Sequence, residues 1–427
     1  MSKSHLVVLG AGPGGYSAAF HAADQGYKVT LVDASLNLGG VCLHSGCIPS
    51  KALLHIVGLL AETKQVKDRG IDFDDPRIDL KCLNKWKDEI ISNFSGGLDL
   101  LCKQRGINYV TGRGVFVDSN TIKTSEGHSI RFDHCIIATG SRPVVPSQFS
   151  VSKAVIMDST EAIKLTSIPK KLLIVGGGYI GLEMGTVYSG LGSSVTLVEI
   201  KDGLLPDVDR DLVRPLQNKL SSEFESIYLD TAVVSIRELG GLAYVTMASS
   251  KESKEEKFDR VLMSVGRRPN TDKIRLENTK VQLDSNGFVK VDFKGQTSDP
   301  AILAIGDISG EPMLAHKASY EARIAIDGLK GKKVTSRNTI IPAVVFTDPE
   351  IAWCGLTESE AKMKNLDFQV AKFPWRASGR AHTLGRTEGF TKLILQPESK
   401  RVLGVGIIGY GAGELIGEGV LAINMGA

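Results

Sequence analysis

The stretch that decides the fold is His5-Leu-Val-Val-Leu9 followed by Gly10-Ala-Gly12-Pro-Gly-Gly15, an apolar strand that runs directly into a glycine-rich turn. A helical stretch follows from Tyr16 to Gln25, and a second apolar strand, residues 28–32, ends at Asp33. The interval from the third glycine to this acid is 33 − 15 = 18 residues, close to the ~20 of a dinucleotide-binding βαβ unit. The pattern predicts such a unit at the start of the chain.

The chain repeats this pattern further on. The strand Leu172-Leu-Ile-Val175 leads into Gly176-Gly-Gly178-Tyr-Ile-Gly181, a helical stretch 182–190 and a strand 194–198 that ends at Glu199. The interval from Gly181 to the acid is again 199 − 181 = 18 residues. One such turn on its own could be purely structural, but both copies keep the strand, the helix, the second strand and the acid. We therefore expect two bound dinucleotides, one in each copy.

Each residue of the repeat has a physical task in nucleotide binding. The first glycine allows the tight turn, the second lets the backbone approach a pyrophosphate, and the third packs the helix on the strand. The helix N-terminus faces the anion, and the acid accepts hydrogen bonds from a ribose 2′-OH. Glu199 would repel a 2′-phosphate and no arginine follows it directly, so the second copy should prefer NAD to NADP.

Length and composition indicate a soluble, multi-domain globular protein. With 427 residues and ~150 residues per domain, the chain should form about three domains. Glycine makes up 46 of the 427 residues, which is a larger fraction than the usual ~7 %. This excess predicts many tight backbone positions. A net charge of +3 from 51 basic and 48 acidic residues argues against a nucleic-acid partner. No apolar run approaches the ~18–20 residues of a membrane span, so we expect no membrane partner.

Six cysteines in a chain of this length do not form the framework of a secreted disulfide-rich protein. We find no targeting segment before the first strand and expect a cytoplasmic location. Four of the cysteines are scattered and are expected to be ordinary buried thiols: Cys82, Cys102, Cys135 and Cys354.

The other two cysteines lie close together in Gly39-Gly-Val-Cys42-Leu-His-Ser-Gly46-Cys47-Ile-Pro-Ser-Lys51. At the start of a predicted helix they could close a disulfide, with strain limited by Gly46. The helix N-terminus and Lys51 would lower the pKa of the thiols after reduction. A structural pair of buried cysteines is the plain alternative. A metal site is less favoured, because the spacing to His44 and His55 does not resemble a zinc module, and we expect no metal.

The segment 39–51 resembles the redox-disulfide segment of the pyridine nucleotide–disulfide oxidoreductases. Within that family the chain is most similar to the dihydrolipoamide dehydrogenases, the E3 components of 2-oxo-acid dehydrogenase complexes, and the resemblance runs from residue 5 to the last residue. Motifs at 138–143, 265–270, 304–307, 313–317 and 341–350 also resemble family segments, and Pro374-Trp-Arg-Ala-Ser-Gly-Arg-Ala381 points to the E3 branch. The implied fold is α/β, with two Rossmann-like domains of the glutathione-reductase type and an α+β interface domain.

The resemblance implies roles for the cysteine segment and its surroundings. Cys42 would be the thiol that exchanges with the dithiol substrate, and Cys47 would sit against the flavin as the charge-transfer thiolate. Lys51 and Glu183 would form an ion pair at the flavin N5 edge; a solvated helix carboxylate is the alternative for Glu183. Tyr179 would gate the nicotinamide pocket, or it could simply pack there.

The same resemblance implies the two sets of cofactor contacts. The residues that would hold FAD are Gly10, Gly12, Gly15, Asp33, Gly40, Val41, Lys51, Gly114, Thr139, Gly140, Ser141, Asp307, Ala315 and His316. Among them, Asp307 would bind the ribityl chain and Gly114 would lie near the adenine. Ala315 and His316 would lie near the flavin pyrimidine ring. NAD would be held by Gly176, Gly178, Tyr179, Ile180, Gly181, Glu199, Val233 and Gly266, with the backbone of Val233 against the adenine.

The implied reaction is a relay: a dihydrolipoyl thiolate attacks a Cys42–Cys47 disulfide, two electrons pass to FAD, and a hydride passes to NAD. Partners would be the dihydrolipoyl group of a 2-oxo-acid complex and a second copy of the chain. Another flavoprotein disulfide reductase is an alternative, but glutathione reductase fits less well because of Glu199, and mercuric reductase would need a further cysteine pair. A flavin-binding subunit without thiol chemistry is the alternative from another class.

One family feature is missing from this sequence. The family base is a histidine in a His-x-x-x-x-Glu arrangement near the C-terminus, and none of the eight histidines here lies beyond His382. His316 and Glu321 have that spacing by coincidence, and His44 is a weak candidate for a proton acceptor. Because the chain ends at Ala427, we expect an incomplete third domain, little lipoamide activity, and retained FAD binding and NADH-dependent diaphorase activity.

The expected domains follow from the motif order. The FAD-binding domain is discontinuous, at 1–145 and 275–335. The NAD-binding domain is inserted at 146–274, and the interface domain occupies 336–427.

Overall fold

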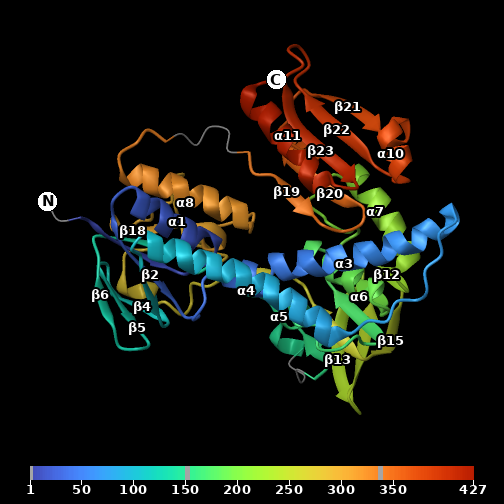
Figure 1. Cartoon of the computed structure of the whole chain (residues 1–427), viewed down its shortest axis with the longest axis horizontal. Helices are drawn as coiled ribbons and strands as arrows, with labels where there is room; N and C mark the ends of the chain where they lie inside the picture. Colours follow the sequence, from blue (N-terminus) through green and yellow to red (C-terminus); the bar gives the residue numbers. More distant parts are fainter. Residues whose placement is uncertain (1–2, 150–153, 335–339) are drawn as a thin grey trace. The chain divides into compact units, whose positions relative to one another are not determined.

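The computed structural model describes residues 3–149, 154–334 and 340–427 and divides into two compact units (Figure 1). The first unit comprises Met1–Pro49, Lys85–Pro143 and Arg267–Arg337, and the second comprises Ser50–Asn84, Val144–Gly266 and Asn338–Ala427. These units are not the three predicted domains, whose boundaries stay a prediction. The predicted start of the interface domain, residue 336, lies outside the described residues.

The first unit is built on a parallel sheet with the strand order β18-β7-β1-β2-β3. Its strands are β1 (His5–Leu9), β2 (Lys28–Asp33), β3 (Asn108–Thr111), β7 (His134–Ile137) and β18 (Ile302–Ala304). Leu6, Val7 and Val8 are fully buried, which is typical of a parallel strand covered on both faces. The helices of this unit include α1 (Pro13–Asp24), α2 (Gly40–Ser45) and α8 (Ala315–Leu329). Small residues bring α1 and α8 together, since a Cβ on Gly14 would lie 3.2 Å from the Cβ of Ala318.

Two smaller sheets complete the first unit. One is antiparallel with the order β4-β5-β6, formed by β4 (Gly114–Asp118), β5 (Thr121–Thr124) and β6 (Ser129–Arg131). The other pairs β8 (Ser141–Pro143) with β17 (Arg267–Pro269).

The second unit contains a parallel sheet of the same kind, with the order β12-β11-β10-β16-β9. Its strands are β9 (Ile156–Met157), β10 (Lys171–Val175), β11 (Ser194–Val198), β12 (Ser226–Tyr228) and β16 (Arg260–Met263). An antiparallel sheet accompanies it, made of β13 (Ala232–Leu239), β14 (Leu242–Ala248) and β15 (Ser253–Phe258). The helices here are α5 (Ser159–Ile163), α6 (Tyr179–Gly190) and α7 (Arg210–Glu223).

The second unit also carries an antiparallel five-stranded sheet, with the order β19-β20-β23-β22-β21. The strands are β19 (Ala343–Val345), β20 (Glu350–Gly355), β21 (Gln369–Pro374), β22 (Phe390–Leu395) and β23 (Val402–Gly409), with α9 (Glu358–Met363), α10 (Gly379–Leu384) and α11 (Ala412–Met425). Helix α11 follows β23 and packs on it: a Cβ on Gly419 would lie 3.0 Å from Val405.

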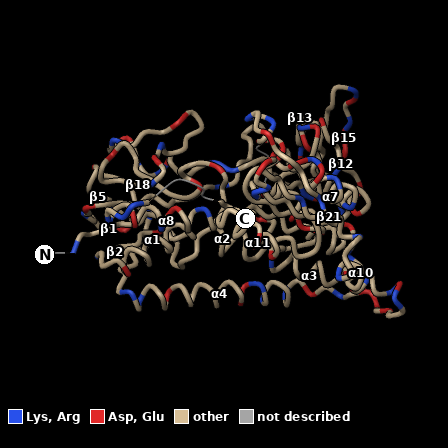
Figure 2. The backbone as a smooth tube through the Cα atoms, turned by 90° about the horizontal axis from the view of Figure 1, so that it is seen from above, with Lys and Arg blue, Asp and Glu red and all other residues tan. Residues whose placement is uncertain are grey.

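Two long helices, α3 (Cys47–Gln65) and α4 (Leu80–Gln104), include residues of both units. Among the described residues, the helical stretch Gly40–Arg69 has the length and hydropathy of a membrane-spanning helix. The expectation that no apolar run approaches that size was therefore wrong. Composition alone does not separate such a helix from a core helix, and Leu53, Leu54 and Val57 are buried in a hydrophobic cluster with residues of α6. In Figure 2, basic and acidic residues are interspersed along the chain, as the near balance of charges predicts.

The two parallel sheets confirm the α/β fold class with two Rossmann-like copies. Each copy has a central strand, β1 or β10, paired in parallel with the strand that ends at its acid and with the strand that leads back to the turn. This arrangement brings both glycine turns to the carboxyl ends of their strands, where α/β sheets bind ligands.

Candidate active site

The two glycine turns have the same backbone geometry. Gly10 and Gly176 have φ values of 106° and 108°, in a region that favours glycine. Their N–H groups donate to Val32 and Val198 at 2.7 and 2.8 Å. A Cβ on either would lie 2.3 or 2.5 Å from a carbonyl oxygen of the neighbouring strand end. Only glycine can occupy the first position of each turn.

The third glycine of each turn is fixed by the first. A Cβ on Gly15 would lie 1.7 Å from the carbonyl oxygen of Gly10, and one on Gly181 would lie 2.2 Å from that of Gly176. These contacts confirm the packing reason that the sequence predicts for the third glycine.

The predicted acids lie beside the glycine turns. Asp33 accepts the N–H of Ala11 at 2.6 Å and that of Ser35 at 2.7 Å. Glu199 accepts the N–H of Gly177 at 2.6 Å and that of Lys201 at 2.8 Å. Each carboxylate oxygen has lone pairs left for a ribose hydroxyl, so these contacts are compatible with the predicted role of both acids, which stays a prediction.

The helix N-termini behind the turns fit a bound pyrophosphate. Gly12 and Gly178 are the N-cap residues of α1 and α6, and glycine has no side chain that could cap the first N–H groups. Such a helix end binds anions through its N–H groups and its dipole. The residues present therefore fit the phosphates of FAD in the first copy and of NAD in the second.

The cysteine segment is attached directly to the first glycine turn. The N–H of Gly39 donates to the carbonyl of Ala11 at 2.9 Å, and a Cβ on Gly40 would lie 2.6 Å from the Cα of Gly12. Gly40 has a φ of 59° and opens α2, which contains Cys42. Cys47 is the first residue of α3, a position at which the helix dipole favours negative charge. Two close backbone contacts thus bring the cysteine segment to the nucleotide-binding turn.

Tyr16 links α1 to this segment. Burial raises the pKa of its hydroxyl, and the charges of Cys42 and Cys47 raise it further. Both cysteines therefore lie near one phenol on the helix that follows the first glycine turn. Cys42 is half-buried, whereas Cys47 is exposed.

The predicted ion pair of Lys51 and Glu183 is present in the second unit. The Nζ of Lys51, on α3, lies 2.9 and 3.1 Å from the two carboxylate oxygens of Glu183, on α6. Glu183 is only 4 % exposed, which excludes the solvated carboxylate. Phe346 completes the arrangement: its N–H donates to Glu183 at 3.1 Å, and its ring lies 4.5 Å from the Lys51 Nζ.

The predicted ribityl-binding residue Asp307 lies in a short turn, residues 306–308, between β18 and α8. Its carboxylate accepts the hydroxyl of Ser141 at 2.5 Å, and the Ser141 oxygen in turn accepts the Arg267 Nε–H at 2.8 Å. Thr139 is tied to Asn270 by two hydrogen bonds of 2.9 and 3.1 Å. The structure thus groups three of the predicted FAD residues and adds Arg267.

The remaining predicted contact residues have less distinctive surroundings, and their roles stay predictions. Gly114 is packed tightly, since a Cβ there would lie 2.6 Å from Leu9. Gly140 and Gly266 have φ values of 67° and 124°. Val233 lies in β13 beside a β-bulge, and Tyr179, which is 39 % exposed, precedes Ile180 in the first turn of α6. Ala315 and the exposed His316 begin α8, and Val41 is exposed in α2.

The sequence offers His316 with Glu321, and His44, as candidate bases, and the structure shows contacts of Glu321 and of His44. Glu321 accepts the N–H of Gly306 at 2.7 Å and pairs with Lys317 at 3.0 Å; the coincidental nature of its spacing to His316 stays a prediction. The Nε2 of His44 lies 2.8 Å from the carbonyl of Leu38.

Three of the four scattered cysteines are buried as expected, but Cys82 is not. Burial raises the pKa of Cys102, Cys135 and Cys354, that of Cys354 to about 12. Cys82 is exposed, and its Sγ lies 3.2 Å from Asp79. The expectation of a buried thiol was wrong there, because Cys82 stands in the first turn of α4.

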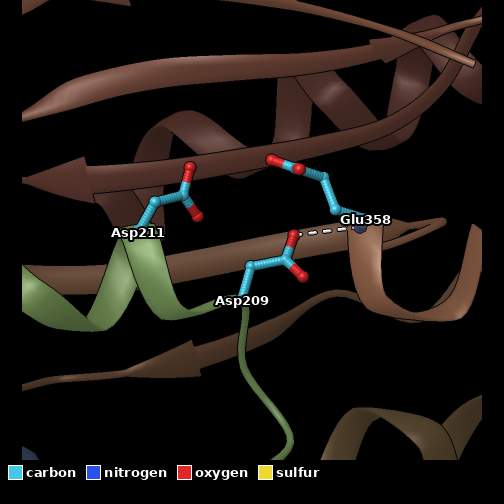
Figure 3. Close-up of side chains that lie close together, drawn as sticks. All are labelled: Asp209, Asp211 and Glu358. Carbon is cyan, nitrogen blue, oxygen red and sulfur yellow. Dashed lines mark hydrogen bonds between the residues drawn. The ribbon is translucent and has the colours of Figure 1, made fainter. Parts of the chain in front are cut away.

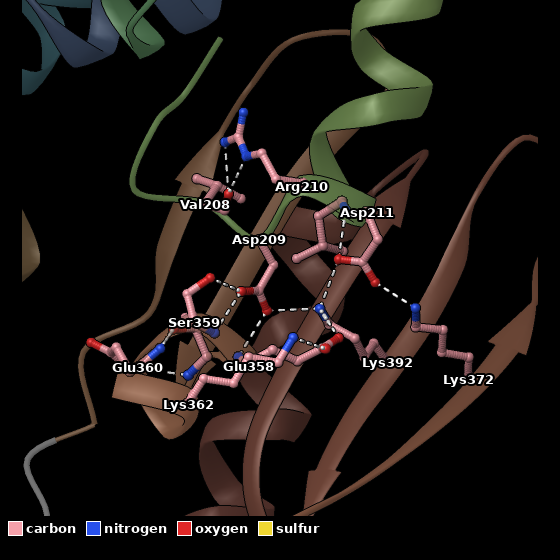
Figure 4. A network of polar contacts seen from close by, with 12 residues as sticks. Val208, Asp209, Arg210, Asp211, Glu358, Ser359, Glu360, Lys362, Lys372 and Lys392 are labelled. Carbon is pink, nitrogen blue, oxygen red and sulfur yellow. Dashed lines mark hydrogen bonds and ion pairs between the residues drawn. The ribbon is translucent and has the colours of Figure 1, made fainter. Parts of the chain in front are cut away.

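Three carboxylates lie close together in the second unit, and none of them belongs to the motifs described above. Ligand atoms of Asp209, Asp211 and Glu358 lie within 4.8 Å of one another (Figure 3). The Nζ of Lys392 lies 2.7, 2.8 and 3.0 Å from them (Figure 4). Because this ammonium already supplies the positive charge, we assign the cluster a structural role.

Comparison with known proteins identifies the class. The profile described as "Pyridine nucleotide-disulphide oxidoreductase" matches residues 4–322, and its "dimerisation domain" matches residues 341–427. The chain therefore belongs to the pyridine nucleotide-disulphide oxidoreductase family. Two curated relatives named dihydrolipoyl dehydrogenase, from Vibrio parahaemolyticus and Haemophilus influenzae, are each 44 % identical over 99 % of this chain, which covers 90 % and 89 % of their lengths. A third, from Geobacillus stearothermophilus, is 40 % identical over 99 % of this chain and 90 % of its own.

Solved structures agree with this assignment. LpdA from Mycobacterium tuberculosis has a TM-score of 0.91 at 26 % identity, over 99 % of this chain and 93 % of its own. The HOCl-induced flavoprotein disulfide reductase RclA from Escherichia coli has a TM-score of 0.87 at 26 % identity, with the same coverage. The expected family, fold and use of FAD and NAD are confirmed.

Some residues of the site carry no local sequence signal. Phe346 and Arg267 reach their partners across 163 and 126 residues of chain. Both stand in segments that resemble the family, but their contacts could be found only from the fold.

Proposed function

We propose that this protein is a dihydrolipoyl dehydrogenase, which oxidises dihydrolipoyl groups through Cys42 and Cys47 and reduces NAD by way of FAD. The observation that carries the proposal is the attachment of the cysteine segment to the first glycine turn by Gly39 and Gly40. A redox-active pair next to a dinucleotide turn is what a dithiol oxidoreductase requires. The relatives of 40–44 % identity that bear this name support it.

The two cysteines would carry out the thiol–disulfide exchange with the substrate. A dihydrolipoyl thiolate attacks the Sγ of Cys42, the Cys42–Cys47 bond breaks, and Cys47 leaves as a thiolate. The second substrate thiol then displaces Cys42 from the mixed disulfide, which releases oxidised lipoyl and leaves two electrons on the cysteine pair. FAD, when bound, supplies the two-electron chemistry that connects this dithiol with NAD.

The remaining residues bind and orient. The first copy holds FAD through its glycine turn, Asp33 and Asp307, and the second holds NAD through its own turn and Glu199. We propose that the Lys51–Glu183 pair balances charge during electron transfer. The buried position of Glu183 and its three hydrogen bonds support a fixed orientation of the Lys51 ammonium.

We also propose that the chain acts as a homodimer on the lipoyl groups of a 2-oxo-acid dehydrogenase complex. The match of residues 341–427 to the dimerisation domain supports the dimer, and its mass in solution would test it. The six cysteines, unlike those of a secreted framework, favour a cytoplasmic location, which cell fractionation would test.

Replacement of the exchange cysteine tests the function. In Cys42→Ser we expect dihydrolipoamide-dependent reduction of NAD to fall at least about a thousandfold, since the covalent route is removed. The charge-transfer absorbance should be present even without a reductant, because Cys47 no longer has a disulfide partner. FAD content and NADH oxidation with an artificial acceptor should persist. Cys82→Ser, at an exposed cysteine outside the segment, is the matched control and should keep full activity.

Two results would contradict the proposal. A flavin-binding subunit without thiol chemistry would show no electron transfer from dihydrolipoamide to FAD, even in a single turnover before mutation. Another disulfide reductase of the family would prefer NADPH or a different disulfide over NAD and lipoamide in a substrate panel.

A further inference from the structure

The turn that presents Asp307 is unusual in its backbone. It begins at Gly306, which has a φ of 78°, and a Cβ at this position would lie 3.0 Å from the Cβ of Ala318 on α8. Within the turn, the N–H and the hydroxyl of Ser309 donate to the carbonyl of Gly306 at 3.0 and 2.8 Å, whereas the N–H of Gly306 needs a partner outside the turn. The carboxylate of Asp307 is oriented from one side by Ser141, at 2.5 Å.

Two residues of α8 hold the turn from the other side. The Nζ of Lys317 donates to the carbonyls of Gly306 and Gly310 at 3.4 and 3.1 Å. Glu321 accepts the N–H of Gly306 at 2.7 Å. The two side chains pair with each other at 3.0 Å. Together they contact the N–H and the C=O of the residue directly before Asp307.

The pair differs from an ordinary surface ion pair on a helix. The side chain of Lys317 is only 10 % exposed, and all of its described contacts serve this turn or Glu321. The pair Arg323–Asp327 on the same helix has the same i,i+4 spacing, but its atoms are 4.0 Å apart and Arg323 is 74 % exposed. Surface pairs of that kind contribute little to stability, whereas a buried ammonium persists only where its hydrogen bonds are made.

We propose that Lys317 and Glu321 are positioning residues for FAD: they fix the 306–310 turn so that Asp307 faces the ribityl chain. The inference deepens the proposed function, on whose FAD site it rests. It also gives a role to Glu321, whose spacing to His316 imitates a catalytic pair while its carboxylate serves the turn.

The test compares FAD with AMP, using protein from which FAD has been removed. AMP reports on the glycine turn and Asp33, but it has no ribityl chain for Asp307. In Lys317→Met we expect the Kd for FAD to rise at least about tenfold, which is 1.4 kcal/mol, with the Kd for AMP unchanged. Arg323→Met is the control on the same helix and should change neither.

A thermodynamic cycle tests whether the pair acts through Asp307. If it does, Lys317→Met combined with Asp307→Asn binds FAD no more weakly than Asp307→Asn alone. Lys317→Arg should recover part of the FAD affinity. The proposal is overturned if the effects of Lys317→Met and Asp307→Asn add fully, or if FAD and AMP affinities fall together. Failure of the unmutated protein to bind FAD would instead refute the proposed function.

Discussion

At the scale of single residues, Gly178 and Gly181 belong to one turn but have different surroundings. A Cβ on Gly181 would lie 2.2 Å from the carbonyl oxygen of Gly176, whereas at Gly178 no heavy atom of the described residues would lie within 4 Å of it. We expect Gly181→Ala to lower the free energy of unfolding by about 3 kcal/mol or more, because backbone cannot yield to a methyl group. Urea unfolding measures this loss.

Gly178→Ala is the matched variant and should separate folding from binding. Gly178 has a φ of −78°, which alanine adopts freely, so stability should change by less than about 1 kcal/mol. The methyl group would nevertheless occupy the approach of the pyrophosphate, and the KM for NAD should rise about tenfold or more. Equal loss of stability in both variants would contradict the distinction between the two glycines.

Residues within a repeated motif could be predicted from their spacing in the sequence. Contacts between residues that are far apart in the chain could not be predicted from spacing. Asp33 and Glu199 follow their glycines at a fixed interval, so spacing alone identified them. The Lys51–Glu183 pair was found through the family resemblance, since 132 residues separate its members. Phe346 meets Glu183 by a main-chain N–H, a contact that any residue type except proline could make and that the sequence therefore does not reveal.

At the scale of elements, Lys392 connects β22 with the starts of two helices of the second unit through ion pairs. It lies in β22 and pairs with Asp209 and Asp211 at the start of α7 and with Glu358 at the start of α9 (Figure 4). Its side chain is 1 % exposed. We expect Lys392→Met to lower the free energy of unfolding by about 3–5 kcal/mol, because it leaves the buried carboxylate of Asp209 without its ammonium partner. Lys372→Met, at a 44 % exposed partner of Asp211, should cost about 1 kcal/mol or less.

The same network predicts a dependence on pH. Burial opposes ionisation of Asp209 and Asp211, but hydrogen bonds from lysines and main-chain N–H groups outweigh it, and the pKa of each carboxyl lies below its ordinary 3.8. Their contribution to stability is therefore present above that value and lost as the pH falls through the lowered one. In Lys392→Met the carboxylates repel one another instead, so acid should relieve the defect. The stability difference between the two proteins should shrink from pH 7 to about pH 4; a constant difference would contradict this account.

The elements themselves were predicted unevenly, for physical reasons. The apolar strands β1, β2, β10 and β11 were expected within about one residue of their bounds, because buried parallel strands form continuous apolar runs. Helix α6 begins at Tyr179, three residues before the expected start, since glycines within the turn obscure the helix. The charged run at β15, Ser253–Phe258, is a strand with outward charges, a pattern that looks the same as a solvated loop.

At the scale of the whole molecule, the chain uses one βαβ design twice for two cofactors. In both copies the first glycine has a φ near 107° and the acid accepts the N–H that follows the first glycine, at 2.6 Å. The copies are held in different units, and the residues that distinguish their tasks lie after the first copy and on the helix of the second. The cysteine segment follows the first copy, whereas the second copy presents Glu183 on the helix after its turn. The repeat supplies nucleotide binding in both copies, while the cysteine segment and Glu183 give the two copies different predicted roles.

If the copies are independent binding sites, each acid should affect one cofactor. We expect Asp33→Asn to raise the Kd for FAD about tenfold or more, because one acceptor oxygen next to the ribose becomes a donor, while the Kd for ADP-ribose at the second copy stays within a factor of about two. Glu199→Gln should do the reverse, with FAD content unchanged. Equilibrium dialysis of both ligands against both variants measures the four effects. Equal weakening of both ligands by either substitution would mean that the two copies share one site or one unfolding equilibrium, and the duplication could then not be explained as two separate nucleotide sites.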